Sequence, residues 1–183
     1  MQRFYRAAFT VAVSLVLFNG IVYAVVAATP AAPAEMQAVD DKAVARARKT
    51  IGMLDDIYKK TIVLITDKYV NDDDDFAAGS AAVLLFAQIT KNGTHEVRLL
   101  DAAGQPYNPE NVAKDAFEKE AIRLLKAGAK SHEKVAEEKG RSVLRVVTPV
   151  PVVLAKCTMC HDHYNDVKEG EPIGAISYSI PIE

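Results

Sequence analysis

The sequence predicts an α+β fold in which helices flank a small antiparallel sheet. Segments with apolar residues at every third or fourth position alternate with shorter segments in which apolar and polar residues alternate. The connections between these segments are short and contain Gly, Pro or Asn, as expected where helices and strands share one layered domain. The 183 residues suffice for one domain with a core and are too few for several. We expect that domain to span residues 35–183.

The first 34 residues form a separate apolar segment. Two arginines precede an uncharged stretch over residues 7–28, and a segment of small residues and prolines follows. The length of the stretch favours a membrane anchor, because a spanning helix needs about 20 apolar residues, whereas Asn19 and Gly20 in its middle favour a cleaved signal peptide. Both interpretations place residues 35–183 outside the cytoplasm, because positive charges precede the apolar stretch. We expect a periplasmic or other extracytoplasmic domain, soluble after cleavage or held by the anchor.

Residues 35–70 predict a long N-terminal helix. They contain no proline, and their apolar residues follow one face of a helix: Val44, Ala47, Ile51, Leu54, Tyr58, Ile62, Ile65 and Tyr69. Such a helix would be about 50 Å long, which is too long for a small domain to cover its whole apolar face. We therefore expect either a break near Gly52 or a second copy packed along the N-terminal half, giving a homodimer.

The acidic run that follows, residues 71–75, should end the helix, because carboxylates oppose the negative end of its dipole. A calcium loop is the alternative, but the glycine and the closing glutamate of that loop are missing. Residues 80–90 then predict a short apolar helix, which Asn92-Gly93 should close.

Three strands and one more helix are predicted in the second half of the chain. Residues 95–101 alternate as a strand, and a helix should begin at Asn108-Pro109 and stop at Gly128. Residues 142–153 and 173–180 read as further strands, and two prolines in the former indicate a sheet edge or a strand end. We expect the charged segment around His132, residues 131–139, to be solvated.

Charge and composition exclude some functions. Lys and Arg number 22 and Asp and Glu 24, so the net charge is -2 and there is no basic field to bind nucleic acid. No acid/base pair or nucleophile arrangement stands out, so we do not expect an enzyme.

The chain contains two cysteines, Cys157 and Cys160, and His161 directly follows the second. This is the spacing of a c-type haem attachment motif. Two cysteines separated by two residues can form thioethers with the two vinyl groups of one porphyrin, and the adjacent histidine can bind the iron as proximal ligand. The predicted export supplies the compartment in which such a haem is attached. We therefore predict one covalently bound haem c.

Other uses of these cysteines fit less well. A disulfide between them would close a very small loop with little entropic gain and would leave His161 unexplained. Zinc could be bound by Cys157, Cys160, His161 and His163, but the adjacent Cys160 and His161 would struggle to reach two corners of a tetrahedron. A thioredoxin-like dithiol would require a βαβ context, which the proline-rich run before Cys157 does not resemble.

The motif leaves the sixth iron ligand and the propionate contacts open. A thiolate ligand is excluded, because both thiols would be bound to the porphyrin. Met53 on the long helix and His95 at the start of a strand are the distal candidates, against a core methionine and a surface histidine as alternatives. Arg98 and Arg145 lie in otherwise apolar strands and are candidates for propionate contacts, against surface-facing arginines as the alternative.

Taken in order, these residues resemble a family of haem-c-binding, PAS-like periplasmic domains, found alone or as the sensing part of membrane histidine kinases and chemoreceptors. The resemblance covers roughly residues 40–183 and rests, with the haem motif, on Tyr69-Val70, Val97-Arg98-Leu99-Leu100, Asn108-Pro109-Glu110-Asn111, Asp115-Ala116-Phe117-Glu118, Leu144-Arg145, Pro149-Val150, Gly170 and Ile173-Gly174-Ala175-Ile176-Ser177-Tyr178-Ser179-Ile180-Pro181. It implies a PAS-like fold, a covalent haem, and redox or small-ligand sensing or electron transfer.

Three functions remain in competition at this point. A sensing or binding module predicts an open or weakly held sixth iron position and, because no output domain follows Glu183, a separate membrane signalling partner. A small monohaem electron carrier predicts a firmly held sixth ligand and a redox partner. An interaction domain stabilised by zinc or a disulfide predicts a colourless protein.

Overall fold

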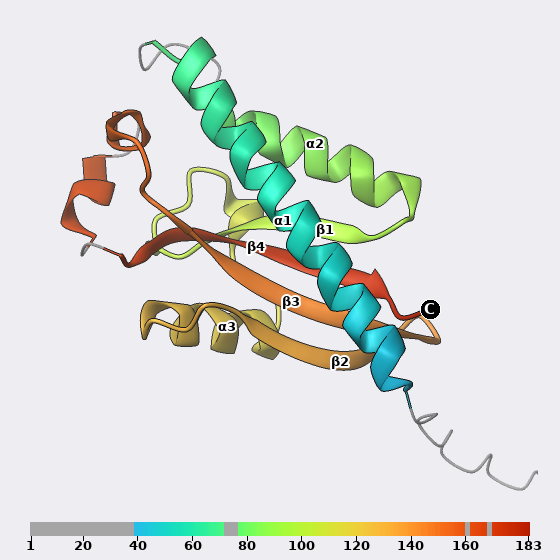
Figure 1. The fold of residues 1–183 in the computed structure, drawn as a ribbon. Helices are drawn as coiled ribbons and strands as arrows, with labels where there is room; N and C mark the ends of the chain where they lie inside the picture. The colour runs from blue at the N-terminus through green and yellow to red at the C-terminus, as the bar shows by residue number, and fades with distance from the viewer. Residues whose placement is uncertain (1–38, 72–76, 160–161, 168–169) are drawn as a thin grey trace, which may run out of the picture. The chain divides into compact units, whose positions relative to one another are not determined.

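The chain folds into a four-stranded antiparallel sheet with helices packed against both faces (Figure 1). The computed structural model describes residues 39–71, 77–159, 162–167 and 170–183, all within one compact unit, Met36–Glu183. The predicted apolar segment, residues 1–34, and most of the acidic run lie outside the described residues. The α+β class predicted from the sequence is confirmed.

The helices are α1 (Asp41–Tyr69), α2 (Ala78–Asn92) and α3 (Ala116–Lys126). Short 3-10 turns follow β1, as η1 (Pro109–Asn111), and connect β3 to β4, as η2 (Ala155–Thr158) and η3 (Asp162–Asp166). The strands are β1 (Glu96–Asp101), β2 (His132–Glu138), β3 (Arg141–Pro151) and β4 (Pro172–Pro181), in the order β1-β4-β3-β2. The helix predicted at residues 80–90 and the strands predicted at 95–101, 142–153 and 173–180 are confirmed. Among the described helices, none is both long and apolar enough to cross a membrane.

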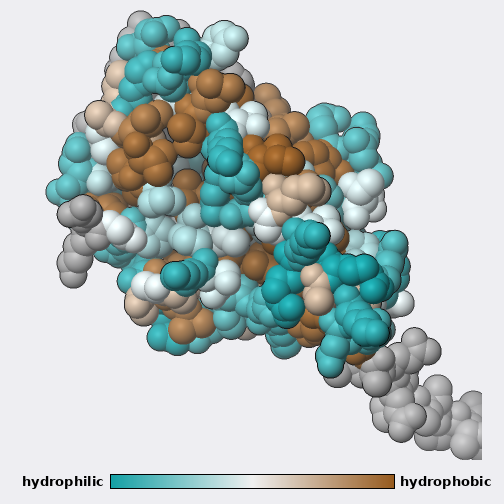
Figure 2. Space-filling view, in the orientation of Figure 1, coloured by the Kyte–Doolittle hydropathy of each residue, from teal (hydrophilic) through white to brown (hydrophobic). Residues whose placement is uncertain are grey.

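Helix α1 is continuous, so the predicted break near Gly52 is wrong. The carboxylate of Asp40 accepts a hydrogen bond from the amide of Lys42 and caps the N-terminus. One face is buried along most of the helix, from Ala43 to Thr66, and this burial outweighs the small cost of an exposed glycine within the helix. The homodimer stays a prediction. Apolar side chains also remain exposed around the C-terminal half of α1 (Figure 2).

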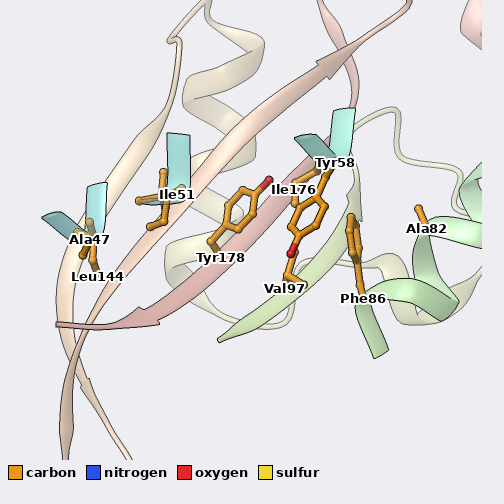
Figure 3. Packing of buried hydrophobic residues seen from close by; sticks show 10 residues of the cluster. Ala47, Ile51, Tyr58, Ala82, Phe86, Val97, Leu144, Ile176 and Tyr178 are labelled. Carbon is orange, nitrogen blue, oxygen red and sulfur yellow. The ribbon is translucent and has the colours of Figure 1, made fainter. Parts of the chain in front are cut away.

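The two faces of the sheet hold two separate apolar clusters. Helices α1 and α2 cover one face, where Tyr58 and Phe86 pack against strand residues that include Val97 and Tyr178 (Figure 3). The rings of Tyr58 and Phe86 lie 5.3 Å apart, and those of Tyr58 and Tyr178 6.4 Å apart. Helix α3 covers the other face, where Leu125 packs against Leu100 and its neighbours on β3 and β4. Alternation along each strand therefore assigns its residues to one helical layer or the other.

The charged segment forms the edge strand β2, which the sequence did not predict, and its residues are exposed or partly exposed. It pairs with β3 from His132↔Val147 to Glu138↔Arg141 through the two-residue turn Lys139-Gly140, whose φ angles are 52° and 73°. Two positive φ angles suit the twist of a tight hairpin. Charged side chains are common on an edge strand, because they prevent pairing with another chain.

The start of α3 differs from the prediction, whereas the prolines of β3 lie at the strand end, one of the two placements predicted for them. The helix predicted from Asn108 is only the turn η1 there, and α3 begins after Asp115, whose carboxylate accepts a hydrogen bond from the amide of Glu118. Strand β3 is central in the sheet, but β2 extends only as far as Val147. The prolines therefore lie in the final stretch of β3, residues 148–151, where β4 is the strand to which β3 pairs.

Candidate haem-attachment site

The cysteine motif lies in the connection between the two central strands, β3 and β4. After β3 ends at Pro151, the chain enters η2, where the amide of Cys157 donates a hydrogen bond to the carbonyl oxygen of Leu154 at 3.0 Å. Cys157 is half-buried. The other two residues of the motif, Cys160 and His161, lie outside the described residues. Cys157 is thus held on a short turn at the end of the sheet where β4 begins.

Lys156 fixes this turn to the C-terminal end of α1. Its ammonium donates hydrogen bonds to the carbonyl oxygens of Asp67, at 2.9 Å, and Val70, at 2.7 Å. The last carbonyl groups of a helix lack partners within the helix, and a cation is favoured at that end of the dipole. Lys156, the residue directly before Cys157, therefore caps the C-terminal end of α1.

An aromatic cluster lies beside Cys157. The rings of His163 and Tyr164, both in η3, meet at a centroid distance of 4.6 Å, and the ring of Tyr107 approaches His163 edge-on at 6.2 Å. Burial, with smaller contributions from the nearby Asp101, Tyr107 and Cys157, raises the pKa of Tyr164 to about 12. The phenol of Tyr164 is therefore neutral at physiological pH.

Exposed apolar side chains flank Cys157 along the chain. Val152, Val153 and Met159 are 38%, 54% and 36% exposed. Figure 2 shows apolar residues gathered where this connection meets the C-terminal half of α1. A half-buried thiol among apolar side chains fits a porphyrin, whose ring needs an apolar surface and whose vinyl carbon needs an accessible sulfur.

The structure does not bring the two distal-ligand candidates to this turn. His95 is followed by Glu96, which pairs with Ser179 on β4. Strand β4 begins near the motif at Pro172, and Ser179 lies seven residues, or about 23 Å, farther along this strand. Met53 is 57% exposed and lies on α1 about 21 Å from Asp67.

His95 instead contacts two side chains of the chain itself, those of Tyr58 and Thr94. Its ring nitrogens lie within hydrogen-bond distance of Tyr58 Oη and Thr94 Oγ1, both at 3.1 Å. Burial lowers the pKa of His95, so its ring is neutral at physiological pH.

The two arginines predicted to contact propionates are paired with carboxylates of the chain itself. Arg98 donates to Glu118 at 2.5 Å and to the carbonyl oxygens of Glu110 and Val112. Arg145 pairs with Asp115 at 2.6 Å, and its guanidinium carbon lies 4.4 Å from the centre of the Phe117 ring. Both side chains therefore stabilise the packing of α3 and η1 against the sheet.

The described residues offer no alternative metal centre, since no group of three or more His, Cys, Asp and Glu side chains among them could hold an ion. The zinc and disulfide alternatives both require Cys160, which is outside this part of the chain, so they stay untested. Sequence reasoning missed Lys156, Tyr107 and Tyr164. A lysine before a cysteine and a tyrosine in a distant loop follow no sequence pattern that marks a site.

The fold and site define a class: an α+β domain that presents a cysteine motif between the central strands of an antiparallel sheet. The model of the Tll0287-like family, described as Tll0287, matches residues 34–181, so the chain belongs to the Tll0287-like family. The crystal structure of the cyanobacterial heme-protein Tll0287 is similar, with a TM-score of 0.50 and 13% identity, covering 78% of this chain and 96% of that chain. At that identity the likeness shows the fold. No curated protein matches the chain.

Proposed function

We propose that the chain is a c-type monohaem protein in which Cys157 and Cys160 bind one haem through thioethers and His161 is the proximal iron ligand. The observation that carries the proposal is the Cys-x-x-Cys-His spacing, with its first cysteine half-buried on a turn between apolar side chains. Membership of the Tll0287-like family supports it, because a solved structure with a similar fold is described as a heme-protein.

The residues around the motif have distinct roles in this proposal. The η2 turn presents the sulfur of Cys157, and Lys156 holds that turn on α1. The exposed side chains of Val152, Val153 and Met159 would give the ring an apolar surface and would exclude water there. When bound, the haem supplies a one-electron couple and an iron that can take a small ligand.

We further propose that the protein is exported by residues 1–34 and acts as a redox or small-ligand sensing or binding module. The placement of the two distal candidates supports this choice over an electron carrier. Met53 lies about 21 Å along α1 from Asp67, and Ser179, the partner of Glu96 next to His95, lies about 23 Å along β4 from Pro172, which favours a sixth position that neither Met53 nor His95 occupies. An iron with an open position binds small ligands, whereas a carrier favours a firmly held sixth ligand.

Visible spectra of the purified protein test this function. The protein is co-expressed with the haem-attachment machinery, and spectra are recorded oxidised, reduced, and reduced with carbon monoxide. We expect a haem spectrum whose reduced form shifts when carbon monoxide is added. A coloured protein without that shift would favour the electron carrier, and a colourless protein would favour the interaction domain.

A further inference from the structure

Lys156 connects the motif to the C-terminal end of α1, beyond Ile62, the last described residue of this helix that packs against the main apolar cluster. Near its middle, α1 is fixed to the sheet: Asp55 accepts hydrogen bonds from Thr148 at 2.6 Å and Tyr178 at 3.0 Å. Towards its C-terminus, Leu64 and Tyr69 are 57% and 73% exposed, whereas Thr66 and Val70 are buried. The turn η2 is among the elements that contact this end of the helix.

The ammonium of Lys156 supplies the polar part of that contact. It satisfies two carbonyl groups at the negative end of a 29-residue helix. Because Lys156 and Cys157 are adjacent in η2, a displacement of the sulfur moves the backbone that carries the lysine. The same ammonium places a positive charge one residue from the proposed attachment point.

We propose that Lys156 is a positioning residue that couples the oxidation state of the haem to the last turn of α1. This inference rests on the proposed haem attachment. The ferric form carries one more positive charge than the ferrous form, so the ammonium of Lys156 is repelled more strongly after oxidation. A Lys156 side chain released into water is screened from that charge, so oxidation favours release and weakens the hydrogen bonds to Asp67 and Val70. By linkage, loss of the ammonium stabilises the ferric form and lowers the reduction potential.

The test compares the wild-type holoprotein with Lys156→Met, Lys156→Arg and the control Lys60→Met. Lys60 is also on α1, but its side chain is 76% exposed and pairs with Asp56 away from η2. The haem potential is measured by optical titration with dithionite as the reductant. Hydrogen exchange of the amides in the last turn of α1 is measured in the ferric and ferrous states.

In the wild type, we expect the amide hydrogens of the last turn of α1 to exchange faster in the ferric state than in the ferrous state. Lys156→Met should lower the haem potential, and its amides in the last turn of α1 should exchange at the same rate in both states. Lys156→Arg and Lys60→Met should behave as the wild type in both measurements. Equal exchange in the two states of the wild type would overturn the proposal, even if Lys156→Met failed to fold. So would an unchanged potential in Lys156→Met. Failure of the haem attachment itself would appear differently, as wild-type protein without covalent pigment.

Discussion

Glu118 places a carboxylate where water hardly reaches it, since its side chain is 3% exposed. It accepts hydrogen bonds from the guanidinium of Arg98 and from the amide of Lys114. A buried carboxylate that loses its cation is left with an uncompensated charge, which is more costly than the pair was favourable. The contacts of Arg98 therefore indicate that this side chain stabilises the folded protein.

We predict that Arg98→Ala lowers the free energy of unfolding by about 3 kcal/mol. The control is Arg123→Ala, because Arg123 forms an exposed pair with Glu120, and its loss should leave the free energy of unfolding almost unchanged. Urea unfolding of the haem-free protein measures both. If Arg98 served mainly to bind a propionate, its removal would destabilise only the holoprotein.

Tyr164 is a single residue that should make the stability of the fold depend on pH. Burial raises its pKa to about 12, above the value of about 10 in an unfolded chain, so the folded state holds this proton more tightly. The resulting stabilisation is complete below about pH 10 and is lost as the pH rises towards 12. We predict that the haem-free wild type loses more stability over this range than Tyr164→Phe, as measured by urea unfolding at each pH. Equal losses in the two proteins would contradict the assignment.

At the scale of elements, α1 is fixed to the sheet by a polar network within an apolar interface. Asp55 accepts from Thr148 and Tyr178 and pairs with Lys59 at 2.8 Å. The hydroxyl of Tyr178 is deeply buried, and burial together with Asp55 raises the pKa of Tyr178. The network therefore fixes the register of α1 against β3 and β4.

We predict that Asp55→Ala costs about 2 kcal/mol, because it leaves the buried Tyr178 hydroxyl without its acceptor. Asp56→Ala is the matched control in the same turn, because Asp56 and Lys60 are 60% and 76% exposed. That change should cost about 0.5 kcal/mol or less. Thermal or urea unfolding compares the two, and equal effects would show that the network does not stabilise the interface.

Two glycines should respond in opposite directions to alanine. Gly140 has a φ of 73° in the β2–β3 turn, where a Cβ atom is strained, so Gly140→Ala should destabilise by about 1 kcal/mol. Gly52 lies within α1 with no atom near the position of a Cβ, so Gly52→Ala should stabilise by about 0.5 to 1 kcal/mol. Unfolding experiments that gave both changes the same sign would contradict the described backbone.

The differences between prediction and structure have physical causes in these elements. Strand β2 was missed because its residues are mostly charged, and its identity comes from pairing with β3. The start of α3 was misplaced because Asn108-Pro109 and Asp115 both have capping chemistry, and tertiary packing selects between them. The break in α1 was expected because sequence alone does not show that the sheet underlies so much of the helix.

At the scale of the whole molecule, local and distant parts of the site differ in how well they could be predicted. The attachment residues are adjacent in sequence, so their spacing is sufficient to identify the motif. The partners of the motif come from α1, the loop after β1 and η3, and only the fold brings Lys156 to Asp67 or Tyr107 to His163. The distal ligand depends on such distant contacts, which is why Met53 and His95 could be proposed from the sequence but not placed.

The central claim is that sulfur atoms of Cys157 and Cys160 bind one haem. Intact-mass spectrometry of the denatured protein, purified after co-expression with the haem-attachment machinery, tests it most directly. We predict the mass of the polypeptide plus one haem, and loss of that haem from the Cys157→Ala, Cys160→Ala double variant. A denatured wild-type protein with the mass of the polypeptide alone would contradict the claim.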